Sequence, residues 1–467
     1  MKSCRLLLFA PVLLSGALVR AAEIPALWAE RVKAVVAVEF YVESESERRP
    51  ALSYGTLADD KGTIILPAAA VDPRVAPDQL KDFKIHRAGE AASIPGTYLG
   101  EDNLTGWHFV HADPKLLSGL VPITAFAAKD GAPSPVPALA EEVWGIGLRN
   151  KDEDFMPYIL MSRIGLIQSL PQRSAIALHE VAAPGLPVFN RDGVLVGLAT
   201  SSFGQSYLQF SRPDRGASPV ILVNVEESSV FPLAEEVLPY LGRIPKSVTG
   251  RPLAWLGAYG LEPLDPDVAQ FMKLDSQGAV VISEVLEGSP AEKAGLKDRD
   301  IIVALDGRPL PRLKPSSVVV GYVDRELARK LPGDQFGVTV LRGSSERIDA
   351  KVTLGDEPKL IRETSRKYFD RLGLTVREFV YGDAVALRVK TGELTGVVAH
   401  FVKPNSPAAV AGLHADDWIR EIDGVEVKTF DQAVGRLAAI EADRDRTDFV
   451  LLVGRGGETA VLRVKLK

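Results

Sequence analysis

Cysteine is almost absent from this sequence. Only Cys4 occurs among 467 residues, and it precedes an apolar N-terminal run. Removal of that run would leave a chain without thiols, which excludes disulfide bridges and cysteine chemistry. We therefore expect a protein that is stabilised by burial of apolar side chains alone. A lipid-anchored form is disfavoured, because the cysteine lies before the apolar run and not after it.

An excess of basic charge is also missing, and histidine is scarce. The chain has 55 Lys and Arg against 61 Asp and Glu, a net charge of −6, and no basic run. Nucleic acid is therefore not an expected partner. The 6 histidines are scattered, and only His108 and His111, near Asp113, lie close in sequence. Because this is too few ligands for a metal centre, we expect no metal and no cofactor.

The first 21 residues have the features of a secretory signal peptide. Lys2 and Arg5 precede an apolar stretch over 6–19, and Ala21 ends a cleavage site with short side chains. The stretch is shorter than the roughly 20 residues that a membrane-spanning helix needs. We expect cleavage after Ala21 and export to the periplasm or the extracellular space. An uncleaved membrane anchor is the other interpretation. No later segment is apolar enough to span a bilayer, so we expect no integral membrane span after cleavage.

Residues 22–242 have the pattern of a β domain. Short β-prone runs alternate with turns, beginning with Val35–Val42 and a turn that ends at Gly62. Short strands at this spacing predict a barrel or a sandwich. Apolar residues at helical spacing predict a helix over 231–241. The segment 243–250, with Pro245 and Gly250, is typical of a linker.

A nine-residue segment then occurs twice. GSPAEKAGL at 288–296 returns as NSPAAVAGL at 405–413, and the Asp-Gly pair at 306–307 returns at 423–424. In both copies the serine can cap a short helix, the proline suits its first turn, and the glycine suits its end. The constant spacing indicates two copies of one domain.

The repeat resembles the PDZ domain, in the strand order of bacterial secreted proteases. The stretch GSPAEKAGLKDRDIIVALDGRPL at 288–310 carries the resemblance. We expect PDZ domains at 251–357 and 368–467, each a small, partly open α+β barrel, with a linker at 358–367.

A hairpin at 182–197, AAPGLPVFNRDGVLVG, resembles the nucleophile hairpin of HtrA/DegP-type trypsin-like proteases. That hairpin reads GNSGGPLVNxxGxVIG, so Pro184 stands at the serine position. The resemblance also places Ala69 at the position of the histidine base and Gly106 at that of the aspartate. From Ala175 to Ala199 there is no Ser, Thr or Cys to serve as the nucleophile.

The resemblance implies a mostly β protein, a trypsin-like double β-barrel followed by two PDZ domains. With all three triad positions replaced, we expect no enzyme activity but a pseudoprotease, since neither nucleophile nor proton transfer remains. It would act as an adaptor, chaperone or regulator in protein quality control. The other interpretation is a divergent serine endopeptidase with relocated catalytic residues, for which Ser201 and Ser202 are candidates. A third is a scaffold whose PDZ grooves have lost their function.

The PDZ resemblance implies peptide binding through a carboxylate-capturing loop and a sheet edge. The loop corresponds to Trp255, Leu256, Gly257 and Ala258 in the first copy, and to Leu372, Gly373 and Leu374 in the second. Facing helices are expected within 316–330 and 430–440. We expect C-terminal or extended peptide segments of proteins as partners. The segment 378–393 predicts a long hairpin beside the second groove. The family also implies a trimer or assembly with active relatives.

Overall fold

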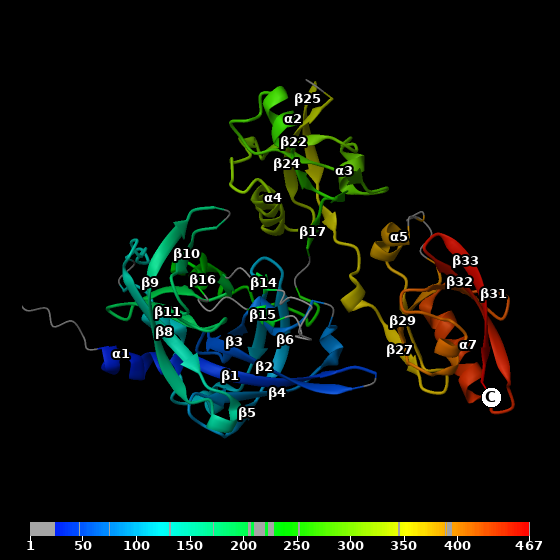
Figure 1. Cartoon of the computed structure of the whole chain (residues 1–467), viewed down its shortest axis with the longest axis horizontal. Coiled ribbons are helices and arrows are strands. Elements are labelled where there is room, and N and C mark those ends of the chain that lie inside the picture. The colour runs from blue at the N-terminus through cyan, green and yellow to red at the C-terminus, as the bar shows by residue number, and fades with distance from the viewer. Residues whose placement is uncertain are drawn as a thin grey trace, which may run out of the picture.

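A computed structural model describes the protein over residues 24–45, 47–73, 75–129, 132–170, 172–203, 207–209, 220–222, 228–250, 253–343, 346–387, 389 and 395–466. The expected signal peptide lies outside these residues. Figure 1 shows a large β domain, followed by two smaller domains that lie on different sides of the chain segment joining them. The fold is mostly β, and the expected class is confirmed: two curled sheets, then two PDZ-like sheets with short helices.

The first domain begins with a helix and a curled antiparallel sheet. The helix is α1 (Ile24–Arg31). The sheet has the order β5-β4-β1-β2-β3-β7-β6. Its strands are β1 (Val35–Glu43), β2 (Arg48–Leu57), β3 (Thr63–Leu66), β4 (Leu80–Arg87), β5 (Ser93–Pro95), β6 (Thr97–Asp102) and β7 (Trp107–His111). The predicted run at 35–42 is therefore a central strand, and the turn at Gly62 joins β2 to β3.

A second curled sheet completes this domain, in the order β12-β11-β8-β9-β10-β16-β13. Its strands are β8 (Glu142–Leu148), β9 (Pro157–Gln168), β10 (Ser174–Ala177), β11 (Pro187–Asn190), β12 (Leu195–Leu198), β13 (Ser201–Phe203) and β16 (Ser228–Pro232). A separate pair consists of β14 (Tyr207–Gln209) and β15 (Val220–Leu222). The hairpin that resembles the nucleophile hairpin is β11–β12.

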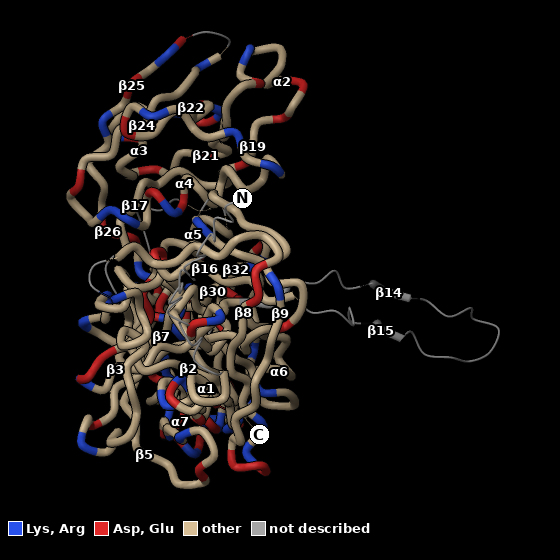
Figure 2. Tube along the Cα trace, turned by 90° about the vertical axis from the view of Figure 1, so that its left-hand side faces the viewer, with Lys and Arg blue, Asp and Glu red and all other residues tan. Residues whose placement is uncertain are grey.

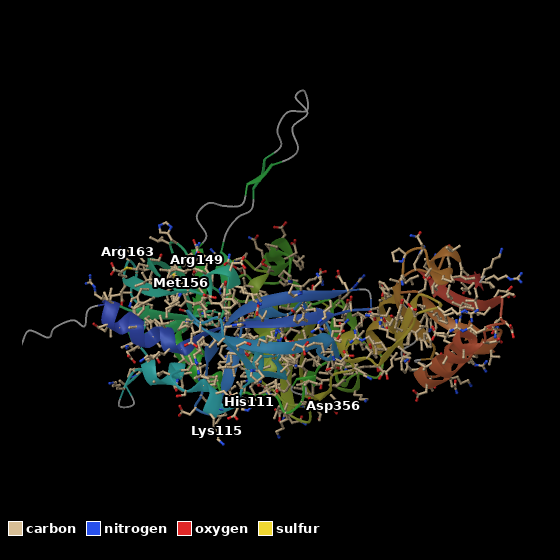
Figure 3. All side chains as sticks on the ribbon, turned by 90° about the horizontal axis from the view of Figure 1, so that it is seen from below. His111, Lys115, Arg149, Met156, Arg163 and Asp356 are labelled. Carbon is tan, nitrogen blue, oxygen red and sulfur yellow. The ribbon has the colours of Figure 1, made fainter. Side chains whose placement is uncertain are left out.

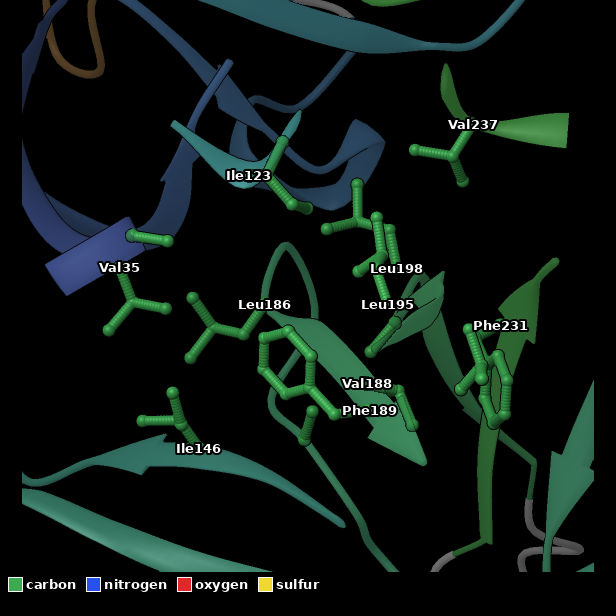
Figure 4. Close-up of a cluster of buried hydrophobic side chains, with 14 of the residues drawn as sticks. Val35, Ile123, Ile146, Leu186, Val188, Phe189, Leu195, Leu198, Phe231 and Val237 are labelled. Carbon is green, nitrogen blue, oxygen red and sulfur yellow. The ribbon is translucent and has the colours of Figure 1, made fainter. Parts of the chain in front are cut away.

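The two sheets share one apolar core. Side chains from β1, β8, β11, β12 and β16 meet there, as Figure 4 shows for Val35, Ile146, Val188, Leu195 and Phe231. All five are buried. Burial of each such side chain contributes about 1.5–3 kcal/mol, which is how a domain without disulfides is stabilised.

The predicted helix over 231–241 is wrong. The segment starts inside β16 and continues as two short 3-10 helices, Ala234–Glu236 and Leu238–Tyr240. Pro239 has no N–H to donate within an α-helix, and Phe231 is fully buried as a strand residue. The apolar spacing therefore reflects core packing and not an amphipathic helix.

The third sheet belongs to the first PDZ-like copy. Its strands are β19 (Glu262–Pro263), β20 (Val280–Val281), β22 (Ile301–Leu305), β23 (Arg308–Pro309), β24 (Gln335–Arg342) and β25 (Glu346–Thr353). Two further pairs are β17 (Ala254–Trp255) with β26 (Gly355–Asp356), and β18 (Ala258–Tyr259) with β21 (Glu284–Val285). The helices are α2 (Pro266–Phe271), α3 (Pro290–Lys293) and α4 (Val318–Ala328).

The second copy has one continuous sheet, β27-β28-β29-β30-β32-β33, with β31 beside β30. Its strands are β27 (Arg366–Phe369), β28 (Leu374–Glu378), β29 (Val397–Val402), β30 (Trp418–Ile422), β31 (Val425–Glu426), β32 (Asp448–Arg455) and β33 (Glu458–Lys465). The helices are α5 (Tyr381–Leu387), α6 (Pro407–Val410) and α7 (Phe430–Ala442). The linker expected at 358–367 therefore overlaps a strand at Arg366 and Lys367.

The repeated segments have the structure that their residues predict. Ser289 Oγ accepts from the N–H of Glu292 at 3.1 Å, and Ser406 Oγ accepts from that of Ala409 at 3.2 Å. Both helix-ending glycines have a left-handed φ, +82° and +87°. Each copy also holds a buried aspartate with an arginine from a later strand, Asp300 with Arg342 and Asp417 with Arg455.

Polar contacts tie the domains together. Arg325 on α4 lies 3.2 Å from Glu236 of the β domain, and Arg362 before β27 pairs with Glu101.

Acidic and basic residues are interleaved along the tube in Figure 2, in agreement with the small net charge. None of the helices in the described part of the chain has both the length and the apolar character needed to cross a membrane.

Candidate functional site

Two of the three positions aligned with the triad lie next to each other. Ala69 is exposed in a 3-10 turn, Ala68–Ala70, that follows β3. Gly106 lies in the turn before β7 with φ +70°, and a Cβ placed on it would come within 2.9 Å of the Ala68 Cβ. Gly106 therefore lies against Ala68, the residue before Ala69.

The third position reaches the same turn from the second sheet. Pro184 is exposed, and the neighbouring Gly185 has φ +89°. A Cβ on Gly185 would lie 2.7 Å from Cδ of Pro67, the residue before that turn. The carbonyl of Gly185 accepts a hydrogen bond of 2.7 Å from the buried Thr56 hydroxyl. Gly106 and Gly185, the neighbour of Pro184, thus both lie against residues 67–68, at the turn that contains Ala69.

Histidine is present near these positions, but its nitrogens are occupied. Nδ1 of the buried His108 is 2.9 Å from the Tyr98 hydroxyl, and Nε2 is 3.3 Å from the Ala68 carbonyl. Burial lowers the pKa of His108. Its ring therefore stabilises the turn Ala68–Ala70 through the contact with the Ala68 carbonyl.

Asp102 has a structural role in this region. Its fully buried carboxylate accepts two hydrogen bonds of 2.9 Å from Arg243 and one from the Thr105 hydroxyl, also at 2.9 Å. The Gly106 N–H donates to the Asp102 carbonyl at 2.7 Å. The hydrogen bonds within this segment stabilise the turn that contains Gly106. The bonds from Arg243 connect the turn to the segment that leads out of the β domain.

His108 and His111 do not form a joint site. They are three residues apart on β7, and successive side chains of a strand alternate between its faces. Figure 3 shows His111 at the edge of the domain. Among the described residues, no three His, Cys, Asp or Glu side chains gather in a group that could hold a metal ion.

The first PDZ-like copy places the predicted loop residues at the start of a strand edge. Leu256 is buried, and its carbonyl accepts from the Ala291 N–H at 2.9 Å. The Gly257 carbonyl accepts from the Leu286 N–H at 2.9 Å. A trans peptide unit directs its C=O and its N–H oppositely. The N–H groups of Gly257 and Ala258 therefore point away from α3 and β21, as carboxylate capture requires.

Glycine is required at this turn. Gly257 has φ +81°, and a Cβ on it would lie 2.1 Å from the Ser289 Cβ. The second copy repeats the arrangement, since Gly373 has φ +65° and a Cβ there would lie 2.2 Å from that of Ser406. Each loop is therefore pressed against the serine that caps the first helix of the repeat.

The edge of β18 is open in the first copy. β18 pairs with β21, and no other strand of the described chain pairs with it. α4 contacts the strands on either side, β17 and β19. Four apolar side chains on β18, on the residues after it and on α4 are partly buried: Ala258, Leu261, Val320 and Leu327. This arrangement suits an extended segment with apolar side chains.

The second copy differs at the corresponding edge. β28 pairs with β29 on one side and with β27 on the other. Phe369, the last residue of β27, faces Leu374. The N–H of Gly373 donates to the Phe369 carbonyl at 2.8 Å. The predicted loop residues Leu372, Gly373 and Leu374 therefore already contact a segment of their own chain.

The segment after β28 forms a helix and not the expected long hairpin, over the residues that are described. Arg377 and Asp383 form a buried bidentate pair at 2.6 and 2.7 Å, which holds α5 against the sheet. The Tyr381 ring lies edge-on to that of Trp255, with centroids 5.4 Å apart. Sequence reasoning missed this contact, because it joins residues of two different copies that lie far apart in the sequence.

Comparison with known proteins agrees with these features. Residues 281–322 and 402–447 match the family model of the PDZ domain. A probable periplasmic serine endoprotease, DegP-like, of Chlamydia pneumoniae is 25% identical over 285 residues, which are 60% of this chain and 51% of the relative. The DegP-like relative of Rhizobium meliloti is 27% identical over 256 residues, 54% of this chain and 45% of its own. The chain thus spans about half the length of these relatives.

A solved structure described as an HtrA-type protease with tripeptide is 14% identical and covers 72% of this chain and 98% of its own, with a TM-score of 0.48. The serine endoprotease of Yersinia pestis is 18% identical, covers 71% and 97%, and has a TM-score of 0.46.

The chain is thus similar to HtrA/DegP-type serine proteases and has two PDZ segments. The expectation that it is not an enzyme is wrong by this comparison, because the matched relatives are named serine endoproteases. The replaced residues at 69, 106 and 184 led to that expectation, but they describe three positions and not the whole domain.

Proposed function

We propose that this chain is an exported HtrA-like protein that binds C-terminal or extended peptide segments through its first PDZ domain. The observation that carries the proposal is the open edge of β18, which begins at a loop whose two N–H groups, those of Gly257 and Ala258, point away from α3 and β21. The periplasmic names of the matched relatives support export.

The ligand chemistry follows from this geometry. A terminal carboxylate would accept hydrogen bonds from the Gly257 and Ala258 amides, and the preceding residues would extend the sheet beside β18. Leu261, which follows β18, and Leu327 on α4 are partly buried apolar side chains, which favours apolar residues near the ligand's C-terminus. The terminal carboxylate would set the register.

A peptide with a free carboxylate tests the proposal against its own C-terminal amide. We expect a fluorescent decapeptide that ends in an apolar residue to bind the full mature chain, and the amide to bind at least about tenfold more weakly, a difference of roughly 1.4 kcal/mol. Ala258→Pro, which removes one capturing N–H, should weaken binding of the acid more than binding of the amide, because the amide oxygen is the weaker acceptor. Equal binding of acid and amide would refute carboxylate capture.

We further propose that the β domain is a serine endopeptidase whose catalytic residues lie outside positions 69, 106 and 184. The names of the matched relatives support the reaction class. Alanine, glycine and proline at those positions offer no nucleophile, base or carboxylate, so hydrolysis requires other side chains. Ser201 and Ser202 are candidates, since β13 directly follows the β11–β12 hairpin.

Digestion of an unfolded protein substrate tests this second proposal. The purified mature chain should cleave the substrate, and a serine-directed covalent inhibitor should stop the cleavage. Ser201→Ala or Ser202→Ala should abolish turnover, while Ser44→Ala, a substitution of a half-buried serine in the loop after β1, should not. Absence of cleavage under conditions in which a DegP-like relative is active would overturn the proposal.

A further inference from the structure

We infer that the peptide groove of the second PDZ domain is filled by the chain's own segment 366–369, which lies where a bound peptide would lie. Sheet topology gives the first reason. β28 corresponds to β18, and its inner neighbour is β29. β27 occupies the other edge, antiparallel to β28, with its C-terminal residue at the carboxylate loop. A peptide that extends a PDZ sheet takes this edge.

Hydrogen bonding at the loop gives the second reason. The Gly373 N–H donates to the carbonyl of Phe369 at 2.8 Å and to that of Asp370 at 3.2 Å. The Leu372 carbonyl accepts from Ala408 N–H, as Leu256 does from Ala291 in the first copy. The donor that would capture a ligand's carboxylate is therefore already satisfied by a main-chain oxygen at the end of β27.

Packing gives the third reason. Phe369 is fully buried in one apolar cluster with Ala433 and Leu437 of α7. α7 contacts both β27 and β28, so β27 lies beside β28 at the edge that the helix covers. Phe369 thus fills the place of the last side chain of a ligand.

The first copy provides an internal comparison. There the segment before the loop turns away, because β17 pairs with β26 and the Glu357 N–H donates to the Leu253 carbonyl at 3.1 Å. The strand edge beside the same kind of loop is therefore free in the first domain and occupied by β27 in the second. The difference lies in the path of the preceding residues and not in the loop itself.

The strand is also fastened to the β domain. Arg366, whose side chain is buried, lies 2.5 Å from Asp78. Arg362 pairs with Glu101 and donates to the Asn103 amide oxygen at 3.2 Å. Opening the second groove would therefore require these contacts to break, so that release of β27 and rearrangement of the domains are coupled. A groove that is opened in this way would accept a peptide that ends in an aromatic residue.

Hydrogen exchange on the full chain without peptide tests the inference, independently of peptide binding by the first domain. We expect amides 373–378 to be protected as strongly as those of β29. Phe369→Ala should accelerate their exchange at least about tenfold, and should let the tetrapeptide Arg-Lys-Tyr-Phe, with a free carboxylate, bind at this site. The control, Lys367→Ala, changes an exposed side chain of the same strand and should do neither.

Rapid exchange of 373–378 in the unmodified chain would overturn the inference, as would binding of the tetrapeptide to the second domain of that chain. The measurements on the unmodified chain decide the matter even if Phe369→Ala fails to fold. Asp78→Ala is a further variant at an exposed side chain, and it should increase exchange at 366–369 without unfolding the domain.

Discussion

Replacement of Gly257 by alanine tests how tightly the first PDZ loop is packed. A Cβ at this position would lie 2.1 Å from the Ser289 Cβ, well inside contact distance. Gly295 offers a matched control in the same domain, because its φ of +82° is close to the +81° of Gly257 and no atom lies within 4 Å of its Cβ position.

The expected magnitudes follow from three contributions. A left-handed φ costs an L-residue about 1–2 kcal/mol, and the stiffer unfolded chain offsets about 0.4–1 kcal/mol of this, so Gly295→Ala should cost about 1 kcal/mol. At position 257, overpacking adds about 1–3 kcal/mol. Displacement of Ser289 also weakens its helix cap, which contributes about 1 kcal/mol. Gly257→Ala should therefore cost about 3–5 kcal/mol.

Hydrogen exchange is the suitable assay, because unfolding of a multidomain chain is not two-state. Amides 254–262 and 289–296 report the stability of this domain in each variant. The same variants should be titrated with the carboxylate peptide, which Gly257→Ala should no longer bind and Gly295→Ala should bind normally. Equal destabilisation by the two substitutions would refute the packing argument.

Three further predictions concern the rest of the chain. Asp383→Asn should destabilise the second PDZ domain by about 3 kcal/mol, because it removes the charge of the bidentate partner and leaves the buried Arg377 only the exposed Asp416 at 3.9 Å, and exchange at 379–387 measures this. Stability of the β domain should fall as pH drops below about 6.5, because burial lowers the folded-state pKa of His108 and the unfolded chain takes up the proton first. Denaturation at pH 7 and at pH 5 checks this. His108→Gln should reduce the difference in stability between the two pH values. Tyr381→Ala should change the tryptophan emission of the chain by uncovering Trp255, and unchanged emission would contradict the contact between the two PDZ domains.

Local chemistry made much of the repeat predictable. Ser289, its neighbouring proline and Gly295 each have one conformational role, and the second copy repeats all three at constant spacing. The expected groove helices at 316–330 and 430–440 correspond to α4 and α7. These features depend on residues within a few positions of each other, which is why the sequence alone indicates them.

Features that depend on distant residues could not be predicted in this way. The path of 366–369 is determined by Phe369 packing on α7 and by Arg366 reaching Asp78, which is 288 residues away. The sequence of 366–369 does not by itself distinguish a linker from a strand. In the same way, Pro239 and the buried Phe231 turned an apparent helical pattern into a strand with two tight turns.

The candidate sites show the same division. Three sequence motifs placed residues 69, 106 and 184 separately, and the structure brings Gly106 and the neighbour of Pro184 against 67–68, next to Ala69. Reaction class did not follow from those three identities, and comparison with the DegP-like relatives changed that expectation. The sequence indicated the PDZ loop in both copies. Whether the strand edge beside the loop is open or occupied depends on the path of the residues before the loop.

Photo-crosslinking tests the central claim most directly. A decapeptide with a free carboxylate and a photoreactive group at its last residue should be irradiated with the full mature chain, and the modified residues mapped. We predict attachment to 256–261 of the first PDZ domain and to 320–327 of α4. Attachment mainly to 372–378 and α7 would contradict this account, and so would attachment that does not depend on the free carboxylate.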